Sequence, residues 1–152
     1  LRKILISPSI FVNQAIERMQ VQAERSGLNL STEIADSLPE ILVDPDKIGQ
    51  VFVNLLHNAI KFTPPGGTIK VIVQEEATKI TFCVEDTGIG IDDNSLNRIF
   101  ERFYKTDPAR STGGTGLGLS ITKHIIDAHN GKVWVESKLG SGSKFFFSIP
   151  KK

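Results

Sequence analysis

The segment from residue 44 to residue 67 constrains the fold most strongly, because it marks both ends of one helix. Asp44-Pro45 is a helix-start signal, since the carboxylate can cap free backbone N–H groups and proline fits the first helical turn. The helix is expected to run to about Thr63, because Pro64-Pro65-Gly66-Gly67 cannot continue it. Two strand-like runs joined by a short hairpin connection follow at once. The chain is therefore expected to pack a helix against antiparallel strands.

The remaining chain alternates helical and strand-like segments. Ser7-Pro8 opens a first amphipathic helix that Gly27 closes, with its apolar positions at Ile10, Ala15, Met19 and Ala23. Further helices are expected at residues 95–100 and 117–128. The strand-like runs cover residues 28–34, 41–43, 68–74, 79–85, 132–136 and 143–149. Because the hairpins require antiparallel neighbours, the predicted fold is an α/β two-layer sandwich, a mixed and mainly antiparallel sheet covered on one face by three main helices.

Composition limits the classes of partner. The 152 residues are the size of one domain with a single core. Lys and Arg number 18 against 17 Asp and Glu, so neither nucleic acid nor an anionic membrane surface is an expected partner. No apolar stretch approaches the roughly 20 residues that cross a bilayer. Cys83 lies in an apolar run and is expected to be a small buried side chain. Because Leu1 is neither a methionine nor part of a leader pattern, we expect it to be an interior position of a longer protein.

The helix that begins at Asp44 carries a polar stripe. Asn54, Asn58 and Lys61 are spaced i, i+4 and i+7, which places them on one side of the helix beside an apolar arc. Asparagine is a mediocre helix former, so two asparagines in the middle of a helix suggest a function other than helix formation. An amide oxygen is a suitable Mg²⁺ ligand. A solvated helix face explains the same spacing equally well.

A carboxylate and two glycines follow one of the central strand-like runs, in Asp86-Thr87-Gly88-Ile89-Gly90. Asp86 could accept a hydrogen bond from an exocyclic amine, and the glycines let the backbone approach a flat ligand. The third glycine and opening helix of a dinucleotide-binding loop are missing, which excludes that alternative. An ordinary strand-to-loop turn remains open.

A second glycine-rich run, Gly113 to Ser120, has the spacing of a phosphate-binding P-loop but carries Leu119 where the lysine is needed. It is therefore not a P-loop. The free backbone N–H groups before the start of a helix can still donate hydrogen bonds to phosphate oxygens. Lys105 and Arg110 lie just upstream. A mobile surface loop is the alternative.

The three histidines, His57, His124 and His129, come with neither a nucleophile pattern nor zinc-ligand spacing. We expect each to have a structural role. For His129 we expect a local hydrogen bond with Asp127 at a helix end.

Four motifs in order resemble those of the sensor histidine kinases, and the resemblance covers nearly the whole chain. They correspond to the N box (residues 54–64), the first glycine box (86–90), the F box (Phe100-Glu101-Arg102-Phe103-Tyr104) and the second glycine box (114–119). The motifs are shared more loosely with the ATPase domains of DNA gyrase, mismatch-repair proteins and heat-shock chaperones. The resemblance implies a Bergerat nucleotide fold with residues 104–115 as a mobile lid over ATP.

The resemblance also implies residue roles. Asn58 is expected to bind Mg²⁺ with help from Asn54, Asp86 to read adenine, and Lys61 to lie near the phosphates together with Phe62. Lys105 stands where many relatives have arginine, and with Asn54, Asn58 and Lys61 it completes the expected catalytic set. The residues expected to contact ATP are Asn58, Lys61, Phe62, Asp86, Gly88, Gly90, Ile91, Phe103, Tyr104, Lys105, Arg110, Gly114, Thr115, Gly116, Leu117 and Gly118.

Kinase activity is favoured over ATP hydrolysis. In the gyrase-like ATPases a glutamate acts as general base at the position that corresponds to Asn54, and an amide cannot take that proton. The acceptor histidine of the kinases lies in a His-Glu-x-x-Thr/Asn helix that these 152 residues lack. Residues 1–152 are therefore expected to be the catalytic and ATP-binding domain, with the dimerisation and sensor regions elsewhere.

The expected partners are the protein's own dimerisation helices in a homodimer and a response regulator, with the domain in the cytoplasm beneath a membrane-anchored sensor and without direct membrane contact. A Bergerat-fold ATPase or serine kinase of another class, and a degenerate nucleotide-sensing scaffold, are the rival hypotheses. The order of the motifs argues against the first, and the intact Asp86, Asn58 and lid glycines argue against the second.

Overall fold

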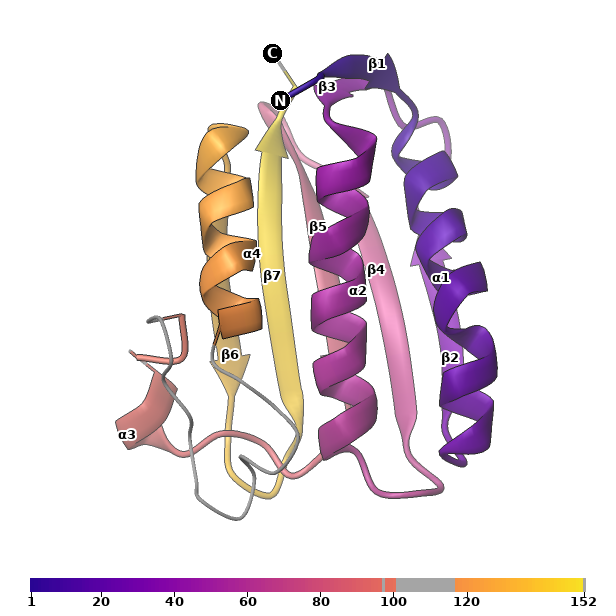
Figure 1. The fold of residues 1–152 in the computed structure, drawn as a ribbon, viewed down its shortest axis with the longest axis vertical. Helices are drawn as coiled ribbons and strands as arrows, with labels where there is room; N and C mark the ends of the chain where they lie inside the picture. Colours follow the sequence, from indigo (N-terminus) through magenta and orange to yellow (C-terminus); the bar gives the residue numbers. More distant parts are fainter. Residues whose placement is uncertain (97, 101–116, 152) are drawn as a thin grey trace.

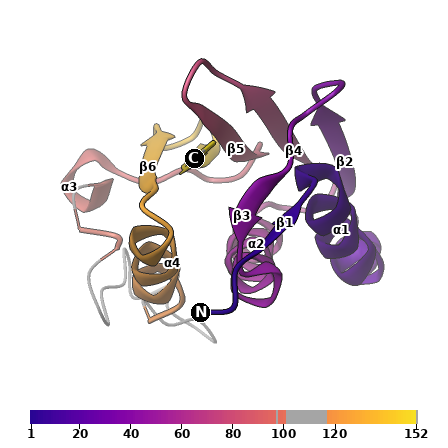
Figure 2. The same cartoon turned by 90° about the horizontal axis from the view of Figure 1, so that it is seen from above.

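The computed structural model describes residues 1–96, 98–100 and 117–151. A five-stranded sheet forms one layer, in the order β2 (Asn29–Ile34), β4 (Thr68–Glu75), β5 (Lys79–Asp86), β7 (Ser143–Pro150) and β6 (Lys132–Ser137). The second layer consists of α1 (Pro8–Arg25), α2 (Pro45–Phe62) and α4 (Leu117–Ala128), all on one face of the sheet (Figures 1 and 2). The short helix α3 (Asp93–Leu96) lies beside β6 (Figure 1). This arrangement confirms the predicted two-layer sandwich.

The sheet is mixed, as predicted. β2 pairs with β4 in parallel, whereas the β4–β5, β5–β7 and β6–β7 pairs are antiparallel. A parallel neighbour requires a crossover connection, and α2 lies in the segment that joins β2 to β4. The sheet order therefore places α2 across the middle of the sheet (Figure 1).

The core lies between the helices and the sheet. Four fully buried phenylalanines occupy its centre, and their ring centroids lie 4.7–6.1 Å apart where they meet: Phe11, Phe52, Phe82 and Phe147. Rings at such separations gain from offset and edge-to-face contact in addition to the area they bury. This cluster fixes α1 and α2 to the central strands β5 and β7.

Two local predictions were wrong, and one strand was missed. Ile10 is 49% exposed, because it lies five residues before the buried Ala15 and so faces the opposite side of α1. The helix expected at residues 95–100 is the shorter α3, followed by turn residues at 98–100. The strand β1 (Ile4–Ile6) was not predicted, and it pairs antiparallel with β3 (Ile41–Val43) apart from the main sheet.

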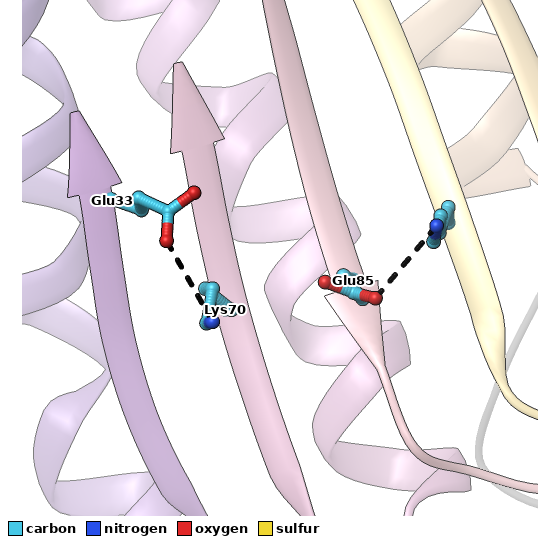
Figure 3. A network of polar contacts seen from close by, with 4 residues as sticks. Glu33, Lys70 and Glu85 are labelled. Carbon is cyan, nitrogen blue, oxygen red and sulfur yellow. Dashed lines mark ion pairs between the residues drawn. The ribbon is translucent and has the colours of Figure 1, made fainter. Parts of the chain in front are cut away.

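Among the described residues, no helix lies on the other face of the sheet, and most side chains there are polar. Two ion pairs with N–O distances of 3.9 Å cross neighbouring strands there, Lys70–Glu33 and Lys144–Glu85 (Figure 3). Cys83 is buried on this face, and burial raises the pKa of its thiol to about 12, so it is a packing residue as predicted. Within the described residues, no helix combines the length and apolar character needed to cross a membrane.

The start of α2 is tied to the end of α4. Asp44 caps α2, since its Oδ1 accepts from the N–H groups of Asp46 and Lys47 at 3.1 and 3.2 Å. Its own N–H donates to Nε2 of the buried His129 at 3.0 Å, so Nδ1 carries the imidazole proton and donates to the Ile125 carbonyl at 2.8 Å. The expected His129–Asp127 bond is therefore wrong, because Asp127 pairs with Lys123 instead.

Asp44 should make the stability of the fold depend on acid pH. The N–H of Arg2, which donates to Oδ2 at 3.0 Å, lowers the pKa of the Asp44 carboxyl, and the N–H groups of Lys47 and Asp46 add to this against the opposing effect of burial. Because the pKa of Asp44 is lower in the folded state, its carboxylate stabilises the fold fully above the unfolded-state pKa of about 3.9. This contribution is lost as the pH falls through the folded-state pKa.

Asp44→Asn keeps a capping oxygen but removes the charge. We expect its unfolding free energy, measured by urea titration, to fall less between neutral and acid pH than that of the original chain. Asp44→Ala should cost about 1 kcal/mol already at pH 7, because the cap itself is lost. An asparagine variant with the same pH profile as the original chain would contradict the role of the charge.

Candidate functional site

Three segments that are far apart in the sequence meet at one end of the molecule. They are the C-terminal end of α2, the loop that follows β5, and the turn between β6 and β7 (Figure 1). The predicted N box and first glycine box therefore share one end of the fold. Backbone hydrogen bonds join the segments: the N–H of Ile89 donates to the Phe62 carbonyl at 3.2 Å, and the N–H of Gly140 donates to the Ile89 carbonyl at 2.8 Å.

The polar stripe lies along the flank of α2. Asn54, Asn58 and Lys61 are partly exposed, whereas the neighbouring apolar positions of α2 are buried against the sheet. The Lys61 Nζ lies 5.3 Å from the centroid of the Phe62 ring, which places the cation at the helix end that meets the loop after β5. The stripe therefore leads along the helix toward Asp86 and Gly88.

Asp86 is the last residue of β5 and is only 7% exposed. Its Oδ1 accepts a hydrogen bond from the N–H of Gly88 at 2.8 Å, which closes a tight turn after the strand. A buried carboxylate with a fixed orientation is suited to accept a hydrogen bond from an amine.

Gly88 lies where the loop comes closest to α2. A Cβ at this position would stand 2.5 Å from the Phe62 carbonyl oxygen, 2.8 Å from the Asp86 Oδ1 and 3.0 Å from the Thr63 Oγ1. No side chain can occupy that space, so the loop after β5 packs directly against the end of α2 and holds the Asp86 carboxylate beside it. Glycine at this position lets the two backbones approach closely.

The hydroxyl of Ser137 holds the next part of the loop. It accepts from the N–H of Ile91 at 2.9 Å and donates to the Gly142 carbonyl at 2.8 Å. Since its one proton is used, the 2.8 Å contact with the Ser143 hydroxyl is donated by Ser143. Gly90 has a φ of +76°, and a Cβ there would stand 2.1 Å from the Lys138 carbonyl oxygen, so the loop also packs closely on the β6–β7 turn. Ser137 was not among the predicted site residues, because nothing in its local sequence distinguishes it.

The structure brings together some of the predicted site residues and leaves others untested. Asn54, Asn58, Lys61 and Phe62 lie on α2, and Asp86, Gly88, Gly90 and Ile91 lie in the adjoining β5 end and loop. Outside the described residues lie Phe103, Tyr104, Lys105, Arg110, Gly114, Thr115 and Gly116. Leu117 and Gly118 are the first two residues of α4.

The possible ligands for the expected magnesium ion are few. Across residues 1–96, 98–100 and 117–151, no three His, Cys, Asp or Glu side chains cluster in a way that could hold a metal ion. Asn58 and Asn54 offer neutral amide oxygens one helical turn apart on α2. Mg²⁺ commonly keeps few protein ligands and takes its remaining oxygen atoms from phosphates and water, so this set fits a magnesium ion that arrives with a nucleotide.

Comparisons with known proteins agree with this geometry. Residues 43–152 match the family described as histidine kinase-, DNA gyrase B-, and HSP90-like ATPase. The chain is 38% identical over 150 residues to the adaptive-response sensory kinase SasA of Synechococcus elongatus, a match that covers 98% of the chain and 38% of SasA. The chain therefore spans well under half the length of this relative.

Solved structures give the same assignment. The nucleotide-free catalytic domain of the histidine kinase ThkA aligns with a TM-score of 0.88 at 30% identity and covers 99% of each chain. Full-length ShkA in complex with AMPPNP aligns with a TM-score of 0.88 at 31% identity, over 99% of this chain and 31% of ShkA. ThkA in complex with the response regulator protein TrrA aligns with a TM-score of 0.83 at 28% identity, over 99% and 42%.

Proposed function

Because the chain belongs to the family of histidine kinase-, DNA gyrase B-, and HSP90-like ATPases, we propose that it binds Mg-ATP and donates the γ-phosphate to a histidine outside residues 1–152. The observation that carries this proposal is the buried Asp86 carboxylate, fixed by the Gly88 N–H at 2.8 Å beside the end of the helix that bears Asn54 and Asn58. That arrangement offers an acceptor for the adenine amine at one end and amide oxygens for a metal-bound triphosphate further along α2.

In this proposal each residue has a limited task. Asp86 orients the base, Gly88 lets the loop pack closely on the end of α2 beside Asp86, and Asn58 with Asn54 holds the magnesium ion. Magnesium, when bound, neutralises charge on the phosphates during transfer. Lys61 adds a positive charge at the same end of α2. The domain therefore acts by positioning and charge stabilisation, while the nucleophile comes from another part of the protein.

Asn54 favours transfer to a protein side chain over transfer to water. An amide cannot accept the proton of an attacking water molecule, so hydrolysis lacks a general base at this position. An imidazole needs no such base to attack phosphorus. We propose that the acceptor is a histidine on the protein's own dimerisation helices, which pair two copies in the whole protein.

The proposal extends to the partner and the setting. A response regulator is the proposed recipient of the phosphoryl group. The histidine kinase ThkA, which aligns with 99% of this chain, has been solved in complex with the response regulator protein TrrA. We propose that the domain lies on the cytoplasmic side of a membrane-anchored sensor.

Labelled ATP tests this function directly. We expect the chain to bind Mg-ATP by itself and to incorporate no label, since its three histidines lack the acceptor pattern. Addition of the dimerisation-helix segment of the same protein should produce an acid-labile label on that segment, as expected for phosphohistidine. Absence of label on the helix segment, under conditions where the chain holds Mg-ATP, would exclude the kinase function.

A further inference from the structure

Ser137 is the last residue of β6, and its hydroxyl joins three pieces of the chain. It accepts from the Ile91 N–H at 2.9 Å, donates to the Gly142 carbonyl at 2.8 Å, and lies 2.8 Å from the Ser143 hydroxyl, which donates to it. A serine hydroxyl has one proton to donate and two lone pairs that accept, and these contacts use all of that capacity. Ser137 can therefore affect a bound nucleotide only by holding other groups in place.

Ser137 and Asp86 lie in one row of the sheet. Asp86 of β5 pairs with Ser143 of β7, and Ser143 pairs with Ser137 of β6. Residues paired in this way project from the same face of a sheet. Both ends of the row alternate with core residues, Val84 on β5 and Val135 on β6, so the row lies on the helix-covered face. The hydroxyl contact between Ser143 and Ser137 thus continues the row that begins at the Asp86 carboxylate.

The loop that follows Asp86 is held at three points. It leaves the end of β5, and its Ile91 N–H reaches Ser137 on β6, which is the second strand along in the sheet. Between these points the Ile89 N–H donates to the Phe62 carbonyl at 3.2 Å, and the Ile89 carbonyl accepts from the Gly140 N–H at 2.8 Å. The start of the loop is therefore fixed by β5, its middle by α2 and the β6–β7 turn, and its far end by Ser137.

The β6–β7 turn also packs on the backbone that carries Asp86. Gly142 has a φ of +82°, and a Cβ there would stand 2.2 Å from the Asp86 carbonyl oxygen and 3.2 Å from the Thr87 Cα. The Gly142 carbonyl is the group that accepts the Ser137 proton. One hydroxyl therefore fixes the far end of the loop and also the turn that packs against its start.

We infer that Ser137 is a positioning residue for nucleotide binding, which holds the loop after Asp86 in its binding geometry before the nucleotide arrives. The inference rests on the proposed nucleotide-binding function and adds to it a residue that does not touch the nucleotide. A loop that is fixed in advance needs no ordering when the ligand binds, and this preserves affinity that ordering would otherwise cost.

Ser137→Ala tests the inference, because it removes the hydroxyl and leaves the strand intact. The Ile91 N–H, the Gly142 carbonyl and the Ser143 hydroxyl then each lose one partner. We expect the dissociation constant for ADP, measured by calorimetry where the variant is fully folded, to rise about tenfold. Ser137→Thr keeps a hydroxyl on a residue type that suits a strand, so it should regain most of the affinity.

Ser141→Ala is the matched control, because it removes an exposed hydroxyl from the same turn. It should bind ADP as tightly as the original chain. Unchanged ADP affinity in Ser137→Ala, or an equal loss of affinity in Ser141→Ala, would overturn the inference.

Amide exchange gives a readout that a general loss of stability would not produce. In nucleotide-free Ser137→Ala, the exchange of the Ile91 N–H should accelerate more than that of Phe82 in the middle of β5, because only the loop is released. ADP should slow the exchange at Ile91 again. Acceleration at Ile91 that is no larger than at Phe82 would contradict the inference. If the unaltered chain does not bind ADP, the proposed function fails, and exchange at Ile91 still decides whether Ser137 holds the loop.

A double-mutant cycle tests whether Ser137 acts through Asp86. If it does, Ser137→Ala should weaken ADP binding less in the Asp86→Asn background than in the original chain, because a displaced loop matters less once its charged acceptor is gone. Multiplicative losses would show that the two residues act independently, which contradicts a positioning role for Ser137.

Discussion

Asp86→Asn is expected to weaken the binding of ATP about ten- to hundredfold, the loss that follows from removing a hydrogen bond to a charged group. The substitution leaves the turn intact, because the amide oxygen can still accept the Gly88 N–H that now lies 2.8 Å from Oδ1. The other carboxylate oxygen becomes an NH₂ group, so a donor would face the donor amine of adenine. The variant therefore tests recognition of the base with little change to the loop.

Glu85 supplies a matched control for this experiment. It is the adjacent residue of β5, but it lies on the helix-free face, where it pairs with Lys144 at 3.9 Å (Figure 3). Glu85→Gln makes the same change of charge one residue away and should leave ATP affinity unchanged. ATP affinity of both variants can be measured by calorimetric titration. Equal affinities for Asp86→Asn and the original chain would exclude Asp86 from the site. Equal losses of affinity in both variants would indicate a general effect of charge.

Local signals in the sequence predicted most of the fold. Helix α2 begins and ends as expected because its signals are contained in the residues themselves: a capping aspartate with proline at one end and two prolines with two glycines at the other. The hairpin of β6 and β7 was predicted for the same reason. The parallel pairing of β2 with β4 carries no local signal, since it depends on where α2 returns the chain. The three-residue β1 is too short to show a period.

The candidate site was predicted less completely, and the reason is physical. Asp86, Gly88 and Gly90 follow a strand in a pattern that can be seen in the sequence. Ser137 looks like an ordinary polar residue there. Its role depends on the atom that stands opposite, because its hydroxyl accepts the Ile91 N–H. Such contacts come from the approach of separate elements, so periodicity and spacing cannot predict them.

Because α2 and the loop after β5 approach closely at Gly88, we expect Gly88→Ala to lower both stability and ATP affinity. The added methyl group would stand 2.5 Å from the Phe62 carbonyl oxygen, a backbone atom that cannot move without shifting the end of α2 or the loop. Overpacking of this kind costs about 1–3 kcal/mol of folding free energy. The same shift would displace the Asp86 carboxylate, so we expect ATP affinity to fall about ten- to hundredfold.

Gly49→Ala is the matched control, because it adds the same methyl group to a helical glycine of α2 where, apart from the neighbouring backbone of the helix itself, no atom lies within 4 Å of the new Cβ. Alanine is favoured over glycine in a helix interior by about 1 kcal/mol, so this variant should be more stable and should bind ATP unchanged. Urea unfolding and calorimetric titration of the two variants should therefore give stability changes of opposite sign and a loss of affinity in Gly88→Ala alone. An alanine at position 88 with unchanged affinity would mean that the contact between Gly88 and the end of α2 does not shape the nucleotide site.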